Sequence, residues 1–244
     1  MISSFKASCI VLSAALELTA INCNAIDLPL EMGGSVAWSS DYVLRGVSQS
    51  DNLPVIQADL HIKPATDWTL GAWASMVRVV PYTRSSEINL YVNRSWNLDQ
   101  DWRISIAGTH YQYLNDPRAA SYDYDEIGAS IYWTDSLFGR IAWSPNSDLY
   151  RAPYSVYRNQ QTLTVEGGFH YVLPHDIGFQ SGAGWYWPLQ ESVGRYLYGS
   201  SGLSRRFGAL HVEVNYFWVQ NQQHRAFNAG PAGGPWTVTV SWNF

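Results

Sequence analysis

The chain ends with the segment Trp236-Thr237-Val238-Thr239-Val240-Ser241-Trp242-Asn243-Phe244, in which apolar and polar residues alternate without interruption. In an extended strand successive side chains point to opposite faces, so one face is apolar and the other carries hydroxyl and amide groups. The segment before it, residues 209–219, alternates in the same way. The pattern predicts antiparallel strands that separate an apolar environment from a polar one.

The tryptophans extend this pattern to the whole chain. The alternation places eleven of the twelve on the apolar face and only Trp73 on the polar face. Most of the eleven lie near strand ends, as the aromatic girdles of a membrane barrel require, whereas a soluble β-sandwich would bury them in mid-strand. The 12 Trp and 16 Tyr, beside 8 Phe and 3 Met, also favour a protein at a membrane–water boundary.

The connections between the expected strands alternate between long and short, which is typical of extracellular loops and periplasmic turns. Backbone amides that face lipid have no water to bond, so such a sheet must close. The sequence therefore predicts an all-β, transmembrane antiparallel barrel of about twelve strands in the outer membrane of a Gram-negative bacterium. We place the strands at residues 33–45, 54–63, 67–78, 86–96, 101–113, 123–134, 137–145, 160–172, 177–187, 194–207, 209–219 and 235–244.

Residues 1–25 have the layout of a cleaved secretory signal peptide. Lys6 precedes the mostly apolar run of residues 7–21, and the small residue Ala25 suits cleavage. An amino-terminal helical anchor is the alternative interpretation. Residues 26–244 then form a single outer-membrane barrel domain without thiol chemistry, because both cysteines fall in the signal segment.

One segment is similar to a known family. Residues 39–52 read Ser-Ser-Asp-Tyr-Val-Leu-Arg-Gly-Val-Ser-Gln-Ser-Asp-Asn, followed by Pro54 and Gln57. This stretch resembles the start of the TorF family of outer-membrane porins, in which a Ser-Asp-Tyr…Arg-Gly-x-Ser-Gln signature opens the mature barrel. The resemblance is strong over residues 36–60, continues to about residue 91 and implies a porin-like barrel. The chain departs from the family pattern at Met76, Asn89 and Asn93-Arg94.

The polar strand faces predict the lining of a lumen. Twelve strands give a backbone radius of roughly 12 Å, which inward side chains reduce to a few ångströms. Cations and anions are interspersed, so a narrow passage for ions or small solutes fits better than a polyanion channel. The alternative is a plugged structural barrel whose charges pair with one another. The predicted lumen and constriction residues are Asp41, Arg45, Asp59, His61, Trp73, Glu87, Arg103, Glu126, Arg140, Glu166 and Glu213.

Within that lining, Trp73 and two acids are predicted to control the conductance. Trp73 is the one inward tryptophan and stands in mid-strand, where an indole occupies a large share of the cross-section. Glu166 and Glu213 lie at comparable depth and predict a weak preference for cations, unless Arg140 neutralises them.

A third interpretation is an outer-membrane lipid hydrolase. Ser86, His110 and Asp125 fall near the extracellular ends of three strands, on the outer face. Their spacing is loose, and the His-x-Ser pair of outer-membrane phospholipases does not occur in the sequence, so a barrel without catalytic residues is favoured.

The remaining features concern partners. The histidines are scattered without metal-ligand spacing, and the sequence predicts no metal site or cofactor. The net charge of −5 opposes nucleic-acid binding. The expected partners are outer-membrane lipid and lipopolysaccharide, small solutes, and the barrel-assembly machinery, for which Trp242 and Phe244 form the expected assembly signal.

Overall fold

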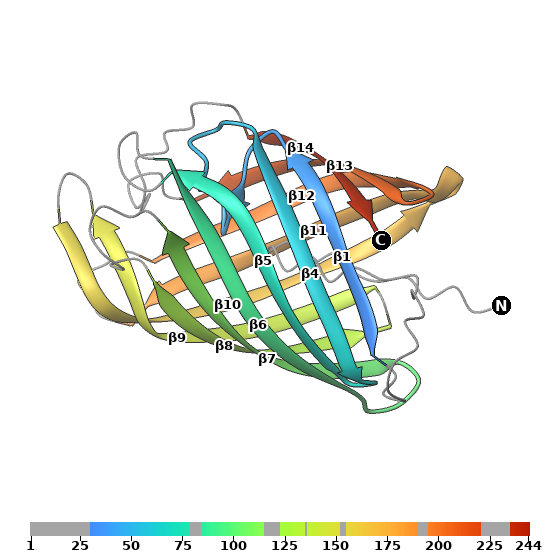
Figure 1. Cartoon of the computed structure of the whole chain (residues 1–244). Helices are drawn as coiled ribbons and strands as arrows, with labels where there is room; N and C mark the ends of the chain where they lie inside the picture. The colour runs from blue at the N-terminus through green and yellow to red at the C-terminus, as the bar shows by residue number, and fades with distance from the viewer. Residues whose placement is uncertain are drawn as a thin grey trace.

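The computed structural model describes residues 30–78, 84–114, 123–134, 136–151, 155–189, 195–220 and 235–244. Within these ranges twelve strands form one closed antiparallel barrel (Figure 1), which confirms the predicted fold and strand number. The expected signal segment and both cysteines lie outside these ranges. The barrel strands are β1 (Glu31–Ser39), β4 (Val55–Ala65), β5 (Trp68–Arg78), β6 (Arg84–Asn97), β7 (Trp102–Leu114), β8 (Tyr124–Trp133), β9 (Leu137–Arg151), β10 (Ser155–Leu173), β11 (Ile177–Pro188), β12 (Tyr196–Phe207), β13 (Leu210–Val219) and β14 (Trp236–Asn243).

Two smaller elements complete the description. A separate two-stranded sheet, β2 (Val43–Leu44) and β3 (Val47–Ser48), lies between β1 and β4 in the chain. A short 3-10 turn, η1 (Pro174–Asp176), joins β10 to β11. In the part of the chain that the structure describes, no helix is long and apolar enough to cross a membrane.

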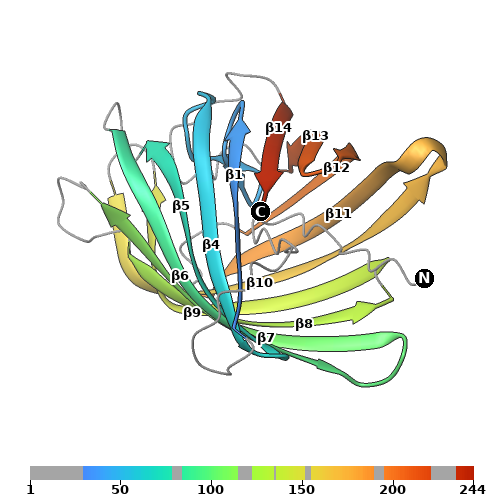
Figure 2. The ribbon, with the colours of Figure 1, turned by 45° about the vertical axis from the view of Figure 1, so that its right-hand side comes forward.

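The barrel closes where the first and last strands meet. β1 pairs with β4 on one side and with β14 on the other, as Figure 2 shows. Past the last residue of β14, Phe244 exchanges both backbone hydrogen bonds with Gly34 at 3.1 Å. Because every barrel strand has two neighbours, the wall of the barrel that the structure describes has no open sheet edge.

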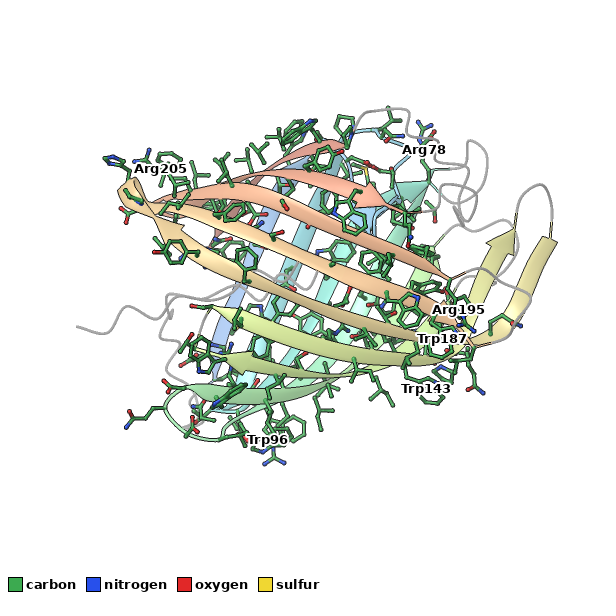
Figure 3. All side chains as sticks on the ribbon, turned by 180° about the vertical axis from the view of Figure 1, so that it is seen from behind. Arg78, Trp96, Trp143, Trp187, Arg195 and Arg205 are labelled. Atoms are coloured by element: carbon green, nitrogen blue, oxygen red, sulfur yellow. The ribbon has the colours of Figure 1, made fainter. Side chains whose placement is uncertain are left out.

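The two ends of the barrel differ. Five connections that are short in sequence lie at one end, which we call the turn end. The connections at the other end, the loop end, are longer, except the one between β9 and β10, which consists of residues 152–154. The eleven tryptophans predicted for the apolar face lie on the outer wall near these ends; Trp96 and Trp143 project from it in Figure 3. Trp68, Trp96, Trp102, Trp133 and Trp242 lie toward the turn end, and Trp38, Trp143, Trp185, Trp187, Trp218 and Trp236 toward the loop end.

Glycines on the inner wall let large side chains of neighbouring strands lie flat against it. A Cβ on Gly71 would collide with the Tyr91 ring, and one on Gly184 would collide with the Tyr198 ring. This is the close packing of aromatic rings over strand glycines that helps to curve sheets and fix their register. The wall therefore carries its large inward side chains partly along its surface rather than straight across the lumen.

Three predicted strand boundaries were wrong. The first strand ends at Ser39, not at residue 45, because residues 40–54 leave the wall of the barrel. The predicted strands at residues 137–145 and 160–172 are too short, because β9 and β10 continue as a long hairpin past two register shifts around Gln160. In Figure 1 this yellow hairpin extends beyond the neighbouring strands.

Candidate functional site

Residues 40–54, which we call the inserted loop, fold into the lumen at the loop end. The loop begins with Ser40, whose backbone amide donates to Val238 on β14, and it reaches β5, where the Arg78 amide donates to the Gln49 carbonyl. Its Tyr42 and Arg45 are both buried. The inserted loop therefore closes off lumen space that twelve strands alone would leave open.

A tight hairpin forms the tip of the inserted loop. Leu44 pairs with Val47, so Arg45 and Gly46 are the two turn residues, and both have positive φ, 51° and 76°. Positive φ at both turn positions is the type I′ geometry that suits two-residue hairpins. Gly46 meets this requirement without strain, whereas Arg45 is held in a region that non-glycine residues rarely adopt.

Internal hydrogen bonds keep the inserted loop folded. The Asp41 carboxylate accepts hydrogen bonds at 2.6 Å from both Ser48 and Ser50. The Ser50 hydroxyl also accepts from the Tyr42 amide at 3.0 Å. Burial raises the pKa of Asp41, and the two serine hydroxyls oppose that rise. The loop is thus a small folded unit, not a flexible connection.

Arg45 connects the inserted loop to the opposite wall. Its guanidinium forms an ion pair with Glu126 on β8. Glu126 also pairs with Arg140 on β9 at 2.7 Å, and Arg140 pairs with Glu166 on β10 at 3.3 Å. Tyr198 on β12 donates its hydroxyl hydrogen to Glu166. The result is an ion-pair chain of two cations and two anions, each bonded to its opposite.

The other side of the inserted loop packs on aromatic rings. Tyr42 donates to the Glu87 carboxylate at 3.1 Å, and its ring meets the Trp73 indole edge-on at 5.2 Å. Tyr111 and Tyr113 of β7 complete this buried cluster. The inserted loop and these rings of the wall consequently occupy much of the loop end of the lumen.

The lumen also holds a buried pair on β4 and a more exposed pair on β13. Asp59 and His61 pair at 2.7 Å on β4, and Asp59 also accepts from Tyr91. The side chains of His211 and Glu213 on β13 are 17% and 20% exposed, against 2–6% for Arg45, Glu126 and Glu166. Solvent therefore reaches the charges of β13 more freely than it reaches Arg45, Glu126 or Glu166, whereas Arg140, at 16%, is about as exposed as His211.

The structure locates all of the predicted lumen residues in the interior, but by two different routes. Nine reach it from barrel strands, including Arg103, whose guanidinium lies 4.6 Å from the Tyr132 ring centroid. Asp41 and Arg45 reach it on the inserted loop and not, as predicted, on the first strand. The prediction that Arg140 might neutralise Glu166 corresponds to an observed pair, whereas Glu213 lies near His211 at 3.5 Å.

Several residues of this site were missed from sequence. Tyr42 and Tyr198 contribute buried hydroxyls to Glu87 and Glu166, and Gly46 allows the hairpin to approach the wall. An available signal was the Arg45-Gly46 pair between two short apolar runs, which is compatible with a tight hairpin. The alternation of apolar and polar residues alone could not identify this hairpin.

The outward Ser/His/Asp set is only partly assembled. His110 and Asp125 are 2.8 Å apart, and Asn146 donates to the other Asp125 oxygen at 2.9 Å. Ser86, however, pairs with Leu114, while the partner of His110 is four residues further along β6. Four strand residues span about 13 Å, so Ser86 cannot be the nucleophile of this pair. Among the described residues, no group of three potential metal ligands occurs either.

A substitution at Gly46 tests whether the hairpin needs its close approach to the wall. A Cβ there would collide with Val219 and lie 2.9 Å from the Tyr198 Cβ. We expect Gly46→Ala to displace the hairpin and make single-channel currents larger and noisier. Gly208→Ala is the matched control, because Gly208 also has positive φ, 63°, but nothing lies within 4 Å of the added Cβ. Equal currents in the two variants would contradict a docked hairpin.

Comparison with solved structures supports the fold. The barrel is similar to the KdgM porin, with a TM-score of 0.53 and 10% identity over 87% of this chain and 99% of that one. It is also similar to the NanC porin, with a TM-score of 0.52 and 13% identity over 87% and 98%. At these identities the likeness shows the architecture of a twelve-strand porin-like barrel and nothing finer.

Sequence comparison gives the family. No curated protein matches the chain. Residues 24–228, most of the chain, match the family described as "Bacterial protein of unknown function (Gcw_chp)". The chain therefore belongs to the Gcw_chp family.

Proposed function

We propose that this protein is an outer-membrane channel for passive movement of ions or small solutes, with access narrowed by the inserted loop. The observation that carries the proposal is a closed barrel with an apolar outer wall and a polar, partly solvated inner wall. The outward tryptophans suit the two membrane interfaces, and the short connections of the turn end suit the periplasmic side, so we assign the loop end to the extracellular side. The resemblance of residues 36–60 to the TorF signature supports the same function.

The charges of the lumen indicate the charge of the solutes that could pass. One similar structure is that of the KdgM porin in complex with disordered oligogalacturonate, with a TM-score of 0.50 and 9% identity over 87% of this chain and 99% of that one. In this chain the ion-pair chain alternates in sign and is balanced. A polyanion would need a continuous basic path, so we propose small solutes without a strong anion preference.

Planar-bilayer recording of the refolded protein tests the proposal. We expect small, discrete current steps, because a narrow lumen passes few ions at a time. The second candidate function is a plugged structural barrel, which the buried inserted loop and the ion-pair chain favour. Insertion into the bilayer without any current would support that candidate and contradict the channel.

The selectivity should depend on Glu213 more than on Glu166. Glu166 is buried and paired with Arg140, whereas Glu213 is partly solvated and near a histidine. We therefore expect a weak cation preference that Glu213→Gln reduces, with little further change on adding Glu166→Gln. The measurement is the reversal potential in a salt gradient. A loss of preference from Glu166→Gln alone would contradict this assignment.

A further inference from the structure

An arginine of β6 lies on the lipid-facing wall, where a charge needs an explanation. Arg94 on β6 shares the outer face with Leu90 and Val92, which are 52% and 36% exposed. Trp68 is its direct partner on β5, and Trp96 follows two residues later on the same face (Figure 3 labels Trp96). Arg94 is therefore set within the tryptophan girdle of the turn end.

The surroundings of Arg94 hold its guanidinium in a defined orientation. Its Cζ lies 5.1 Å from the centroid of the Trp68 ring and 4.8 Å from that of the Trp96 ring. The Nε donates to the Asp67 carboxylate at 3.0 Å. Asp67 is itself fixed, because its carbonyl accepts from the Ser95 amide at 2.9 Å. We call these four residues, Asp67, Trp68, Arg94 and Trp96, the Arg94 site.

The Arg94 site leaves hydrogen-bond donors free. Neither terminal nitrogen, Nη1 or Nη2, has a hydrogen-bond partner among the described residues, and the side chain is 42% exposed. A guanidinium fork of this kind matches two oxygens of a phosphate. The flanking indoles are the side chains that prefer the depth of lipid headgroups.

We propose that the Arg94 site binds the phosphodiester group of a glycerophospholipid in the inner leaflet of the outer membrane. The free Nη pair donates to the phosphate oxygens, Asp67 keeps the fork oriented, and the indoles contact the glycerol and the first acyl carbons. The proposal rests on the membrane location and orientation given under the proposed function.

A second arginine provides an internal comparison. Arg205 on β12 also lies on the outer wall toward the turn end, 5.1 Å from the Phe207 ring centroid. No carboxylate of the described chain pairs with it, and it has one aromatic neighbour where Arg94 has two. Arg205 has a similar charge and depth but lacks the orienting partners of Arg94.

Native mass spectrometry of the detergent-solubilised barrel after incubation with phosphatidylglycerol tests the inference. We expect the protein to retain one phosphatidylglycerol, and Arg94→Gln to reduce the retained fraction about tenfold, the factor that 1.4 kcal/mol produces. Arg205→Gln should have little effect. Arg94→Lys should retain an intermediate fraction, because an ammonium keeps the charge but loses the fork.

The outcomes separate the possible failures. Equal retention by the Arg94→Gln variant and the unchanged protein would overturn the inference while leaving the channel proposal intact. Inorganic phosphate at the same concentration should neither bind nor displace the lipid; displacement would show a free-anion site instead of a lipid site. Failure of the protein to insert into phospholipid vesicles would contradict the membrane location itself.

Discussion

Replacing residues 40–54 with a two-residue Asn-Gly turn should raise the single-channel conductance several-fold. The inserted loop narrows the loop end of the lumen, and both its hairpin and its ion pair with Glu126 would be lost. The barrel itself should survive, because Ser39 and Val55 are already paired in register where β1 and β4 meet. An Asn-Gly turn is the connection that such a pair of strands favours.

The same variant should also change selectivity. Without Arg45, the ion-pair chain retains two carboxylates and one guanidinium, so the pore should prefer cations more strongly. Arg45→Met separates the two effects, because it removes the charge while keeping the loop and should change the reversal potential more than the conductance.

Trp73→Ala should raise the conductance less than excision of the loop does, since Tyr42 and the rest of the loop remain above the shortened side chain. Unchanged conductance after excision would show that the narrowest point lies elsewhere.

The barrel was predictable because each strand repeats the same two-face pattern. Alternation in a segment such as residues 236–244 determines which side chains face outward, and a one-residue error would bring lipid-facing groups into the lumen. The outward tryptophans follow from the same rule, with nine of them 37–61% exposed. Closure then follows from the need to pair every amide.

The inserted loop was not predictable by that rule, and the reason is visible in its residues. The alternation of the first strand continues by coincidence through Tyr42 and Leu44, so the alternation rule alone extends the predicted strand to Arg45. The direction of the chain changes because Arg45 and Gly46 adopt positive φ. Such a turn depends on contacts with distant strands, here Glu126 and Tyr198, that no local pattern contains.

The inserted loop also gives a physical meaning to the segment that resembles the TorF family. Asp41, Ser48 and Ser50 bond to one another, Tyr42 contacts Glu87, and the Arg-Gly pair forms the turn. These residues have a common role, because together they build a folded loop and attach it to the wall. A segment that formed only a strand would need apolar outward positions but not this particular set of polar groups.

Deletion of Phe244 should lower the amount of assembled barrel by far more than it lowers the stability of the barrel that does form. Phe244 follows β14 and exchanges two backbone hydrogen bonds with Gly34, while its ring lies over that glycine. The five register pairs from Ser35–Asn243 to Ser39–Thr239 would remain. Two lost hydrogen bonds are worth roughly 1–3 kcal/mol together, which is small for a barrel of twelve strands. The expected role of Trp242 and Phe244 as an assembly signal predicts a much larger loss before folding is complete, so most of the truncated chain should fail to reach the outer membrane as assembled barrel. The measurements are the amount of barrel in the outer membrane and the denaturant midpoint of refolded protein.

Phe244→Tyr is the control, because it keeps the ring and both hydrogen bonds and should assemble normally. Normal membrane levels of the truncated chain would refute the assembly role, and a midpoint that falls in parallel with the amount would assign Phe244 to closure of the β1–β14 seam alone.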